Sequence, residues 1–328
     1  LYMWTYAVVI LHLSNHSYEK FLLPFFSFAA VSVSAFCFYV LFDYMFNLNW
    51  LSESVKEEMY LQIGVHDGFV RMNNVNVGMF CFLIPYLLAS IILQGKGSDR
   101  ITVFAFLIAT VGAVLASRRI VLLLLLLAPA MTYLTFRLAE FKGSGVLRRT
   151  LGFYCLSAVM LTATLFLLSS YNSTVFDGFT NRILDALIVD EQSPRQVQHV
   201  ALMEGFLDNP YVGSGFGGLT DVVRSEERPW TYELTYSKIL FNGGIFGMIS
   251  LTLFFVFFTY LAILKVQKCA AKKDVYIPML VGFFSVMIAA ASNPYLSSFD
   301  FIFVLSIIPL ILNSRSSLTQ GERRTAAG

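Results

Sequence analysis

The chain has 328 residues, of which 57% are hydrophobic and only 13% are charged, and its mean hydropathy is +0.68. Soluble domains carry roughly 25% charged residues, so this composition excludes an ordinary soluble globular protein and predicts a polytopic membrane protein. The formal net charge of +2 is uninformative by itself, and we expect no nucleic-acid partner. The chain begins at Leu1 inside an apolar run without a charged flank, so we expect that an N-terminal part is missing.

Apolar segments long enough to cross a membrane recur along the chain. A helix needs about 20 apolar residues to cross the hydrocarbon core, and we predict nine spans: 1–13 (incomplete), 21–46, 77–94, 101–117, 120–136, 150–170, 237–264, 276–292 and 300–312. All should be helical, because an open chain in lipid must satisfy its backbone hydrogen bonds internally. The predicted fold is an all-α polytopic membrane helix bundle with one long extracytoplasmic loop. Its parts are 1–170 (six spans), 171–236 (the loop), 237–312 (three spans) and 313–328 (a tail).

Basic residues in short loops predict the orientation, because such loops stay in the cytoplasm. Lysines and arginines concentrate in 137–150, 265–274 and the C-terminal tail, and the same count places 14–20 and 95–100 inside. The segments 47–76, 117–119, 171–236 and 293–299 then face outward. The four cysteines share no C-x-x-C spacing, and we expect them to be core residues rather than metal ligands.

Some arginines lie in segments predicted to face outward, where the positive-inside rule disfavours them. Arg71 lies just before a predicted span, and two spans meet at Ser117-Arg118-Arg119 with almost no loop between them. Charges at membrane depth usually face a protein interior or a wet cavity. Two interpretations stay open: these side chains reach outer-leaflet phosphates, or they bind an anionic headgroup in a site.

The loop 171–236 is the one long polar stretch of the chain. It carries ten acidic residues, and its basic residues are all arginine: Arg182, Arg195, Arg224 and Arg228. The guanidinium group offers a rigid fork of donors that matches phosphate, where lysine offers a point charge. We therefore expect the chemistry of the protein in this loop.

Two local structures are predicted inside the loop. Ser193-Pro194 marks a helix start, and 195–207 has the pattern of an amphipathic helix with Ala201, Leu202, Phe206 and Leu207 on its apolar side. Glycines 213, 215 and 218 satisfy G-x-G-x-x-G, but no β-strand precedes them, which excludes a dinucleotide site. We predict a glycine-rich turn whose backbone can approach a ligand or a neighbouring helix.

The chain re-enters the membrane through Glu233, Tyr236 and Lys238. A carboxylate at the head of a span must have a partner. Glu233 is a candidate general base, and the alternative is a salt bridge with Lys238 or with an arginine. Glu204 is the alternate base. His199 stands alone, so we expect a capping or surface role for it rather than catalysis.

A series of residues with recognisable spacing runs through the outward segments. It comprises Arg71 to Asn74, Ser117-Arg118, Arg195, Asn209-Pro210-x-x-Gly213-x-Gly215-Phe216-Gly217 and residues 236–247. This series resembles the bacterial O-antigen ligase/polymerase family, membrane proteins that assemble surface polysaccharides. The resemblance is strongest over about 180–250 and extends to about 65–135.

The resemblance implies that periplasmic arginines hold the diphosphate of an undecaprenyl-linked sugar donor. Arg118 and Arg195 best match these by position. The wider expected substrate-binding set adds Arg71, Arg119, Arg182, Arg224, Arg228, Tyr236 and Lys238. The resemblance also implies a metal-independent transferase without a cofactor in the bacterial inner membrane. Its expected partners are the lipid-linked oligosaccharide, membrane lipid and a chain-length regulator.

This sequence departs at one position from the pattern of the ligase branch of that family. Ligases carry a His-Asn pair about eleven residues before a glycine, and here the count back from Gly244 reaches Glu233-Leu234. The ligase histidine is absent, which favours a polymerase of lipid-linked repeat units over a ligase of finished chains. A transporter or flippase of the same lipid should show an internal repeat and charges at mid-membrane. We find no repeat, and Asp43 and Asp300 lie near span ends. A purely structural subunit is the last alternative.

Glycosyl transfer from a lipid diphosphate assigns roles to these residues. Negative charge builds on the departing diphosphate, and fixed arginines, Arg195 first, stabilise it more in the transition state than in the ground state. The acceptor hydroxyl must lose a proton, and Glu233 is the expected base.

Overall fold

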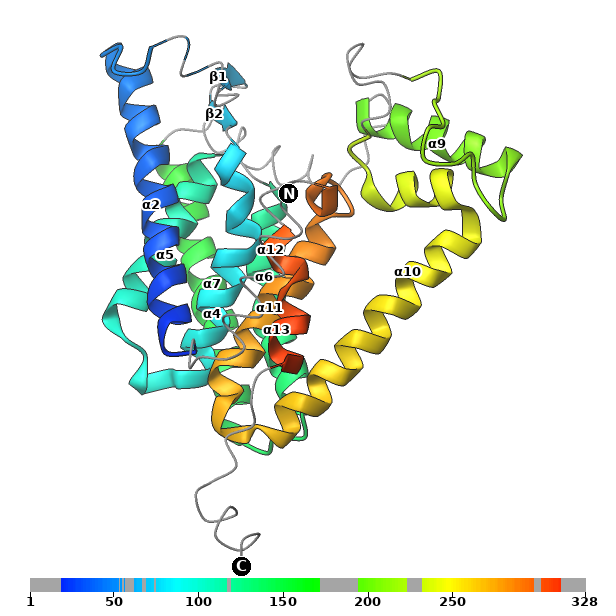
Figure 1. The fold of residues 1–328 in the computed structure, drawn as a ribbon. Helices are drawn as coiled ribbons and strands as arrows, with labels where there is room; N and C mark the ends of the chain where they lie inside the picture. The colour runs from blue at the N-terminus through cyan, green and yellow to red at the C-terminus, as the bar shows by residue number, and fades with distance from the viewer. Residues whose placement is uncertain are drawn as a thin grey trace, which may run out of the picture.

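The computed structural model describes residues 19–52, 54, 56, 62–66, 69–73, 75–116, 119–171, 194–222, 232–297 and 302–313. The elements in chain order are α2 (Glu19–Phe46), β1 (Gln62–His66), β2 (Phe69–Asn73), η1 (Val75–Met79), α4 (Phe80–Gln94), η2 (Gly95–Gly97), α5 (Arg100–Leu115), α6 (Arg119–Leu138), α7 (Ser144–Tyr171), α9 (Pro194–Asp208), α10 (Thr235–Lys268), η3 (Ala270–Lys272), α11 (Lys273–Ala289), η4 (Tyr295–Ser297), α12 (Ile302–Leu305) and α13 (Ile307–Asn313). Figure 1 shows a helix bundle from which α10 leaves at an angle, with α9 beyond its far end.

Helix α4 forms the centre of the bundle. Almost every one of its residues is buried, and it packs against α2, α5, α6 and α11. Gly282 of α11 permits the closest approach, because a Cβ atom there would lie 2.5 Å from Cε2 of Phe82. The ring of Phe26 lies 5.1 Å from that of Phe82 and 4.7 Å from that of Tyr86, centroid to centroid. This apolar helix therefore faces protein on every side.

Four helices in the described part of the chain are long and apolar enough to cross a membrane: Lys20–Phe46, Val77–Gly97, Ile120–Leu138 and Thr235–Lys268. They match the predicted spans 21–46, 77–94, 120–136 and 237–264. The predicted 101–117 and 300–312 correspond to shorter apolar helices, Arg100–Leu115 and Phe303–Asn313, and 150–170 and 276–292 fall in α7 and α11. Span 1–13 lies outside the described residues. These helices support a membrane protein, and the predicted number of nine spans is not confirmed.

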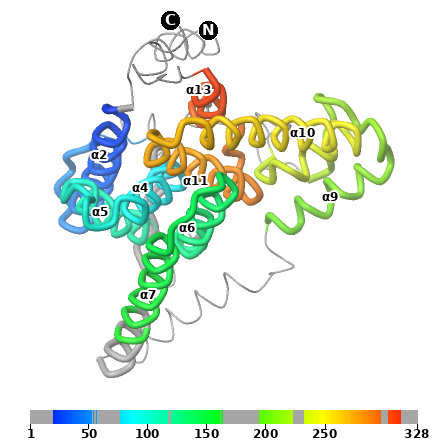
Figure 2. Tube along the Cα trace, turned by 90° about the horizontal axis from the view of Figure 1, so that it is seen from below, coloured from blue at the N-terminus to red at the C-terminus, as the bar shows by residue number. Residues whose placement is uncertain are grey.

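Three of the basic segments predicted to share one side of the membrane, 95–100, 137–150 and 265–274, lie at one end of the bundle (Figure 1). The Nη1 atom of Arg149 donates to the carbonyl of Leu93 at 2.6 Å. The side chain of Gln267 donates to the carbonyl of Leu138 at 3.1 Å, so segments around 93, 138–149 and 267 meet. Helix α9 and the β1–β2 pair lie at the opposite end (Figure 1). Seen along the bundle, α7 and α10 point outward from the central helices in different directions (Figure 2).

The expectation of an all-α fold needs one addition. Strands β1 and β2 pair antiparallel, with Gln62 opposite Asn73 and His66 opposite Phe69. The β-branched and aromatic residues of these short segments favour extended backbone. Arg71 of the predicted substrate-binding set lies in β2, opposite Gly64.

Candidate functional site

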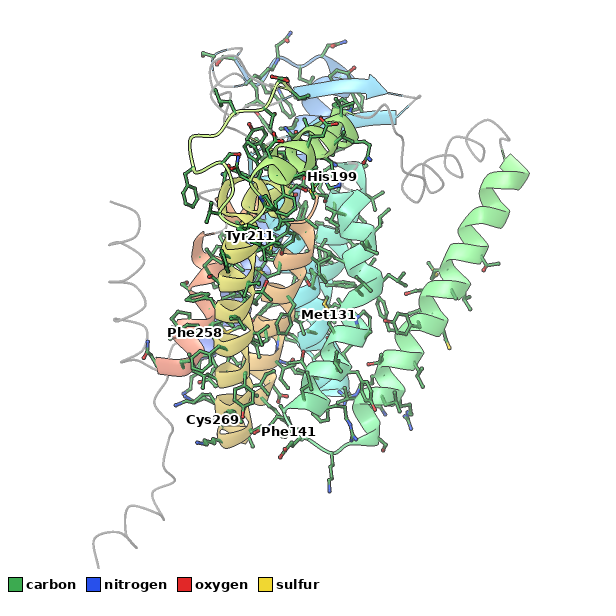
Figure 3. The ribbon with its side chains drawn as sticks, turned by 90° about the vertical axis from the view of Figure 1, so that its right-hand side faces the viewer. Met131, Phe141, His199, Tyr211, Phe258 and Cys269 are labelled. Carbon is green, nitrogen blue, oxygen red and sulfur yellow. The ribbon has the colours of Figure 1, made fainter. Side chains whose placement is uncertain are left out.

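Helix α9 packs against the first turns of α10 at the end of the bundle opposite the basic segments. Figure 3 shows His199 and Tyr211 at this end and Phe141 and Cys269 at the other. Leu202 of α9 forms a small separate core with Tyr232 and Phe241. The predicted helix 195–207 is confirmed as Pro194–Asp208. Its predicted apolar side needs a correction, because Leu207 is 69% exposed.

The glycine turn after α9 docks into a break in α10. At Gly244 the backbone has φ +60°, and the helix kinks there. The break separates the carbonyls of Phe241 and Asn242 from their helical donors, Ile245 and Phe246. The docked turn supplies new hydrogen-bond partners for all four of these groups, the two carbonyls and the two amides. The amide of Ser214 donates to Phe241 at 2.8 Å, that of Gly215 to Asn242 at 3.0 Å, that of Ile245 to Pro210 at 2.8 Å and that of Phe246 to Tyr211 at 3.2 Å.

Glycines make this docking possible. Gly213 has φ +70°, and a Cβ atom on it would lie 2.5 Å from the carbonyl carbon of Asn242. A Cβ atom on Gly244 would overlap the backbone of Tyr211 in the same way. The prediction that the turn lets the backbone approach a neighbouring helix is confirmed. The helix that contains the predicted span 237–264 is interrupted at Gly244, where the backbone is not helical.

Arg195 and Glu233 form an ion pair between α9 and the residues that precede α10. The Nε atom of Arg195 donates to Oε2 of Glu233 at 2.9 Å, and the two side chains are 48% and 31% exposed. Nη2 of Arg195 also lies 3.4 Å from Oδ1 of Asn293, beyond α11. Asn293 in turn accepts a hydrogen bond from the hydroxyl of Thr235 through its backbone carbonyl, at 3.0 Å. Three segments far apart in the sequence thus meet at this pair.

The location of the pair favours anions. Arg195 is the second residue of α9, and Glu233 lies two residues before α10, so the pair lies beside the N-termini of both helices. Helix N-termini carry partial positive charge and exposed amide groups, which attract phosphates and carboxylates. Within the described part of the chain, Nη1 of Arg195 makes no hydrogen bond. This edge of the guanidinium group can therefore donate a hydrogen bond to a further anionic oxygen.

Two neighbours on α9 hold the pair in place. The side-chain carbonyl of Gln198, which is fully buried, accepts a hydrogen bond from the backbone amide of Glu233 at 2.9 Å. One turn after Arg195, Nδ1 of His199 lies 3.0 Å from the hydroxyl of Ser237. His199 thus connects α9 to α10 beside the pair and is not a bare surface residue.

Of the other predicted site residues, the structure describes some and leaves the rest outside the described part of the chain. Tyr236 donates its hydroxyl to the carbonyl of Met287 at 2.6 Å, and Lys238 is partly buried one turn into α10. Glu204, the alternate base, is exposed on α9. Arg118, Arg182, Arg224 and Arg228 lie outside the described residues, as do the side chains of Arg71 and Arg119.

Sequence reasoning missed Asn293 and Gln198. Asn293 stands in a short polar stretch, Ser292-Asn293-Pro294, in a segment predicted to face outward, which was the available signal. Gln198 gave none, because a single glutamine on a helix surface has no distinctive pattern. Among the described residues, no group of three or more His, Cys, Asp or Glu side chains is placed to hold a metal ion.

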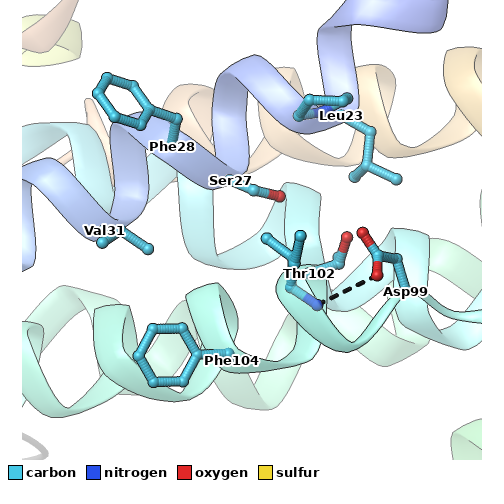
Figure 4. A pocket seen from close by; sticks show the side chains of 9 residues that line it. Leu23, Ser27, Phe28, Val31, Asp99, Thr102 and Phe104 are labelled. Carbon is cyan, nitrogen blue, oxygen red and sulfur yellow. Dashed lines mark hydrogen bonds between the residues drawn. The ribbon is translucent and has the colours of Figure 1, made fainter.

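A pocket of about 380 Å³ lies elsewhere, between the first turns of α2 and α5. Its lining is mostly apolar, with Asp99, Ser27 and Thr102 as polar residues (Figure 4). Asp99 caps α5 by accepting the amide of Ile101 at 3.3 Å, which explains its position. The pocket is at the end of the bundle opposite Arg195 and does not belong to the candidate site.

The candidate site is therefore a half-exposed guanidinium–carboxylate pair at the meeting point of two helix N-termini, beside an imidazole and a hydroxyl. Such a site can bind an anion through Arg195 and take a proton from a bound hydroxyl through Glu233. Comparison of the chain with protein-family models and with curated proteins finds no match.

Proposed function

We propose that this protein is a bacterial inner-membrane glycosyltransferase that polymerises undecaprenyl-diphosphate-linked oligosaccharide repeat units on the periplasmic face. The observation that carries the proposal is the ion pair of Arg195 and Glu233 at the N-termini of α9 and α10. The spacing of the residues around it, which resembles the O-antigen ligase/polymerase family, supplies the substrate class.

The reaction joins one repeat unit to the next. A hydroxyl oxygen of the acceptor sugar attacks the anomeric carbon of the donor sugar, and the bond from that carbon to the lipid diphosphate breaks. The bonding electrons leave on the diphosphate oxygen, and the hydroxyl proton passes to the carboxylate of Glu233. Arg195 stabilises the charge that develops on the diphosphate.

The ion pair has a role before substrate arrives. A diphosphate that binds the Nη1 edge of Arg195 brings two further negative charges to the helix N-termini, which attract anions. It competes with the carboxylate of Glu233 for the guanidinium group, and the acceptor hydroxyl donates to that carboxylate. Buried neighbours such as Gln198 keep the backbone of Glu233 in position during this exchange. The arginines outside the described residues are the expected additional partners of the diphosphate.

The test is reconstitution of the full-length protein in vesicles with a synthetic undecaprenyl-diphosphate repeat unit. The proposal predicts a ladder of longer lipid-linked products. Transfer of the unextended unit to a second lipid or protein acceptor would instead identify a ligase. Movement of the lipid across the bilayer without any new glycosidic bond would identify a carrier and overturn the proposal.

A further inference from the structure

The turn that docks into α10 carries exposed apolar side chains on its outer side. We call these five residues the apolar patch: Leu207 (69% exposed), Tyr211 (65%), Val212 (68%), Phe216 (93%) and Leu219 (57%). The residues 207–222 include no lysine or arginine and only two carboxylates, Asp208 and Asp221. Large apolar side chains exposed this close together in the chain indicate an interaction surface.

Part of the backbone beneath the patch pairs with protein groups, chiefly those of α10. The carbonyls of Pro210 and Tyr211 and the amides of Ser214 and Gly215 pair with the broken turn of α10. Inside the turn, the amide of Gly213 donates to the carbonyl of Asn209 at 2.9 Å. Irregular backbone tolerates a lipid environment only when other protein groups satisfy its donors and acceptors. The carbonyls of Pro210 and Tyr211 and the amides of Gly213, Ser214 and Gly215 meet that condition.

The patch continues the outer surface of α10. The ring of Tyr211 lies 6.3 Å from that of Phe246, centroid to centroid, and Phe246 is 60% exposed. Further along α10, Ile249 and Leu253 are also exposed, at 48% and 62%. This helix is among those that are long and apolar enough to cross a membrane, so its exposed side chains face lipid if it does.

The length of α10 places the patch at one boundary of the membrane. Lys265 lies in the last turn of α10, at the end of the bundle where the basic segments meet. At 1.5 Å per residue, about 30 Å of helix separates Lys265 from Ile245, which equals the thickness of the hydrocarbon core. Ile245 and the docked turn lie at the other end of this length of helix, which is the opposite boundary when α10 crosses the membrane.

We propose that residues 207–219 insert the apolar patch into the outer leaflet of the membrane, at the boundary between headgroups and acyl chains. The partner is the lipid surface, and apolar area rather than charge provides the attraction. This contact holds α9, and with it Arg195 and Glu233, at the level of the lipid headgroups. The inference requires that α10 spans the membrane and does not depend on glycosyl transfer.

The test measures how deeply a fluorophore at the patch enters lipid. Phe216→Cys, in a Cys155→Ser background that leaves only buried cysteines, is labelled with an environment-sensitive fluorophore. The full-length protein is placed in phosphatidylcholine nanodiscs that contain lipids with a nitroxide at acyl carbon 5 or 12. Matched labels at Glu204→Cys, exposed on α9, and at Leu253→Cys, exposed on α10, report water and mid-membrane. Leu219→Cys repeats the measurement at a second patch position.

The expected result is a graded set of depths. The labels at positions 216 and 219 should lose about half of their fluorescence to the carbon-5 nitroxide and less to the carbon-12 nitroxide. The Leu253→Cys label should show the reverse order, and the Glu204→Cys label should be quenched by neither. Labels at 216 and 219 that behave like the label at 204, while the label at 253 is quenched, would overturn the inference. If the label at 253 is not quenched either, α10 does not span the membrane, and the inference fails with it.

Discussion

The amide of Gly215 donates a hydrogen bond to the carbonyl of Asn242 at 3.0 Å, and this carbonyl lacks its helical partner because α10 breaks at Gly244. The contact joins the turn after α9 to the head of α10. It therefore fixes the position of the helix that carries Arg195 relative to the segment that carries Glu233. The candidate site depends on a broken helix whose missing hydrogen bonds are made by a loop.

Neighbouring glycines in α10 should respond differently to substitution. Gly244→Ala forces a side chain into the left-handed region, which costs about 1–3 kcal/mol by itself, and its Cβ atom overlaps the backbone of Tyr211. Gly243→Ala is the matched control, because a Cβ atom there meets nothing within 4 Å. Thermal unfolding in detergent should show a clearly lowered Tm for the first variant and an unchanged Tm for the second. Equal Tm values would mean that the helix is not broken at Gly244.

The ion pair of Arg195 and Glu233 should contribute little to stability. Both side chains are substantially exposed, and exposed pairs typically contribute about 0.2–1 kcal/mol. A double-mutant cycle with Arg195→Ala and Glu233→Gln should therefore give a coupling free energy of unfolding below about 1 kcal/mol. A much larger coupling would assign the pair a structural role and weaken its assignment to catalysis.

His199 should act as a positioning residue through Ser237. A glutamine at this position can keep a hydrogen bond to the Ser237 hydroxyl, whereas a phenylalanine cannot. We expect His199→Gln to retain most of the proposed polymerising activity and His199→Phe to lose it several-fold, with KM rather than kcat changing. The steady-state rates of both variants check this. If both variants abolish turnover equally while substrate still binds, the imidazole itself exchanges a proton.

The centre of the bundle should tolerate no added volume at Gly282. A Cβ atom there lies 2.5 Å from the ring of Phe82, and overpacking of this kind costs about 1–3 kcal/mol. Gly282→Ala should lower the Tm, and Phe82→Leu should restore part of it by making room. Gly152→Ala on α7, where a Cβ atom meets nothing within 4 Å, should leave the Tm unchanged or slightly raised. A lowered Tm for Gly152→Ala would show that replacing any helical glycine destabilises this protein, and that the contact with Phe82 is not the cause.

Hydropathy predicted which segments are apolar helices but not which of them form the centre. Helix α4 is buried on all sides while α10 is largely exposed, yet both are equally apolar, because lipid and protein core accept the same side chains. Hydropathy likewise cannot show a break such as the one at Gly244. Three glycines, 243, 244 and 247, occur within five residues, and only tertiary contact decides which one takes a positive φ.

Inside the polar loop, local signals were sufficient for single elements. Ser193-Pro194 and the apolar periodicity predicted α9 to within one residue at each end, because a proline at the first position and an amphipathic pattern are local properties. A salt bridge of Glu233 with Lys238 or with an arginine was the predicted alternative to its role as a base, and no signal in the sequence selected Arg195. The third member, Asn293, lies 98 residues from Arg195 along the chain, and no local pattern connects them.

The most direct test of the account is a single-turnover assay with Glu233→Gln and Arg195→Ala in vesicles that contain the undecaprenyl-diphosphate repeat unit. Asp208→Asn, which changes an exposed carboxylate on the helix that carries Arg195, is the control. The account predicts that Glu233→Gln binds the donor as wild type does but forms no product. Arg195→Ala should lose donor binding and product formation together, and the control should match wild type. Product formation by Glu233→Gln at the wild-type rate would contradict the assignment of this carboxylate as the base.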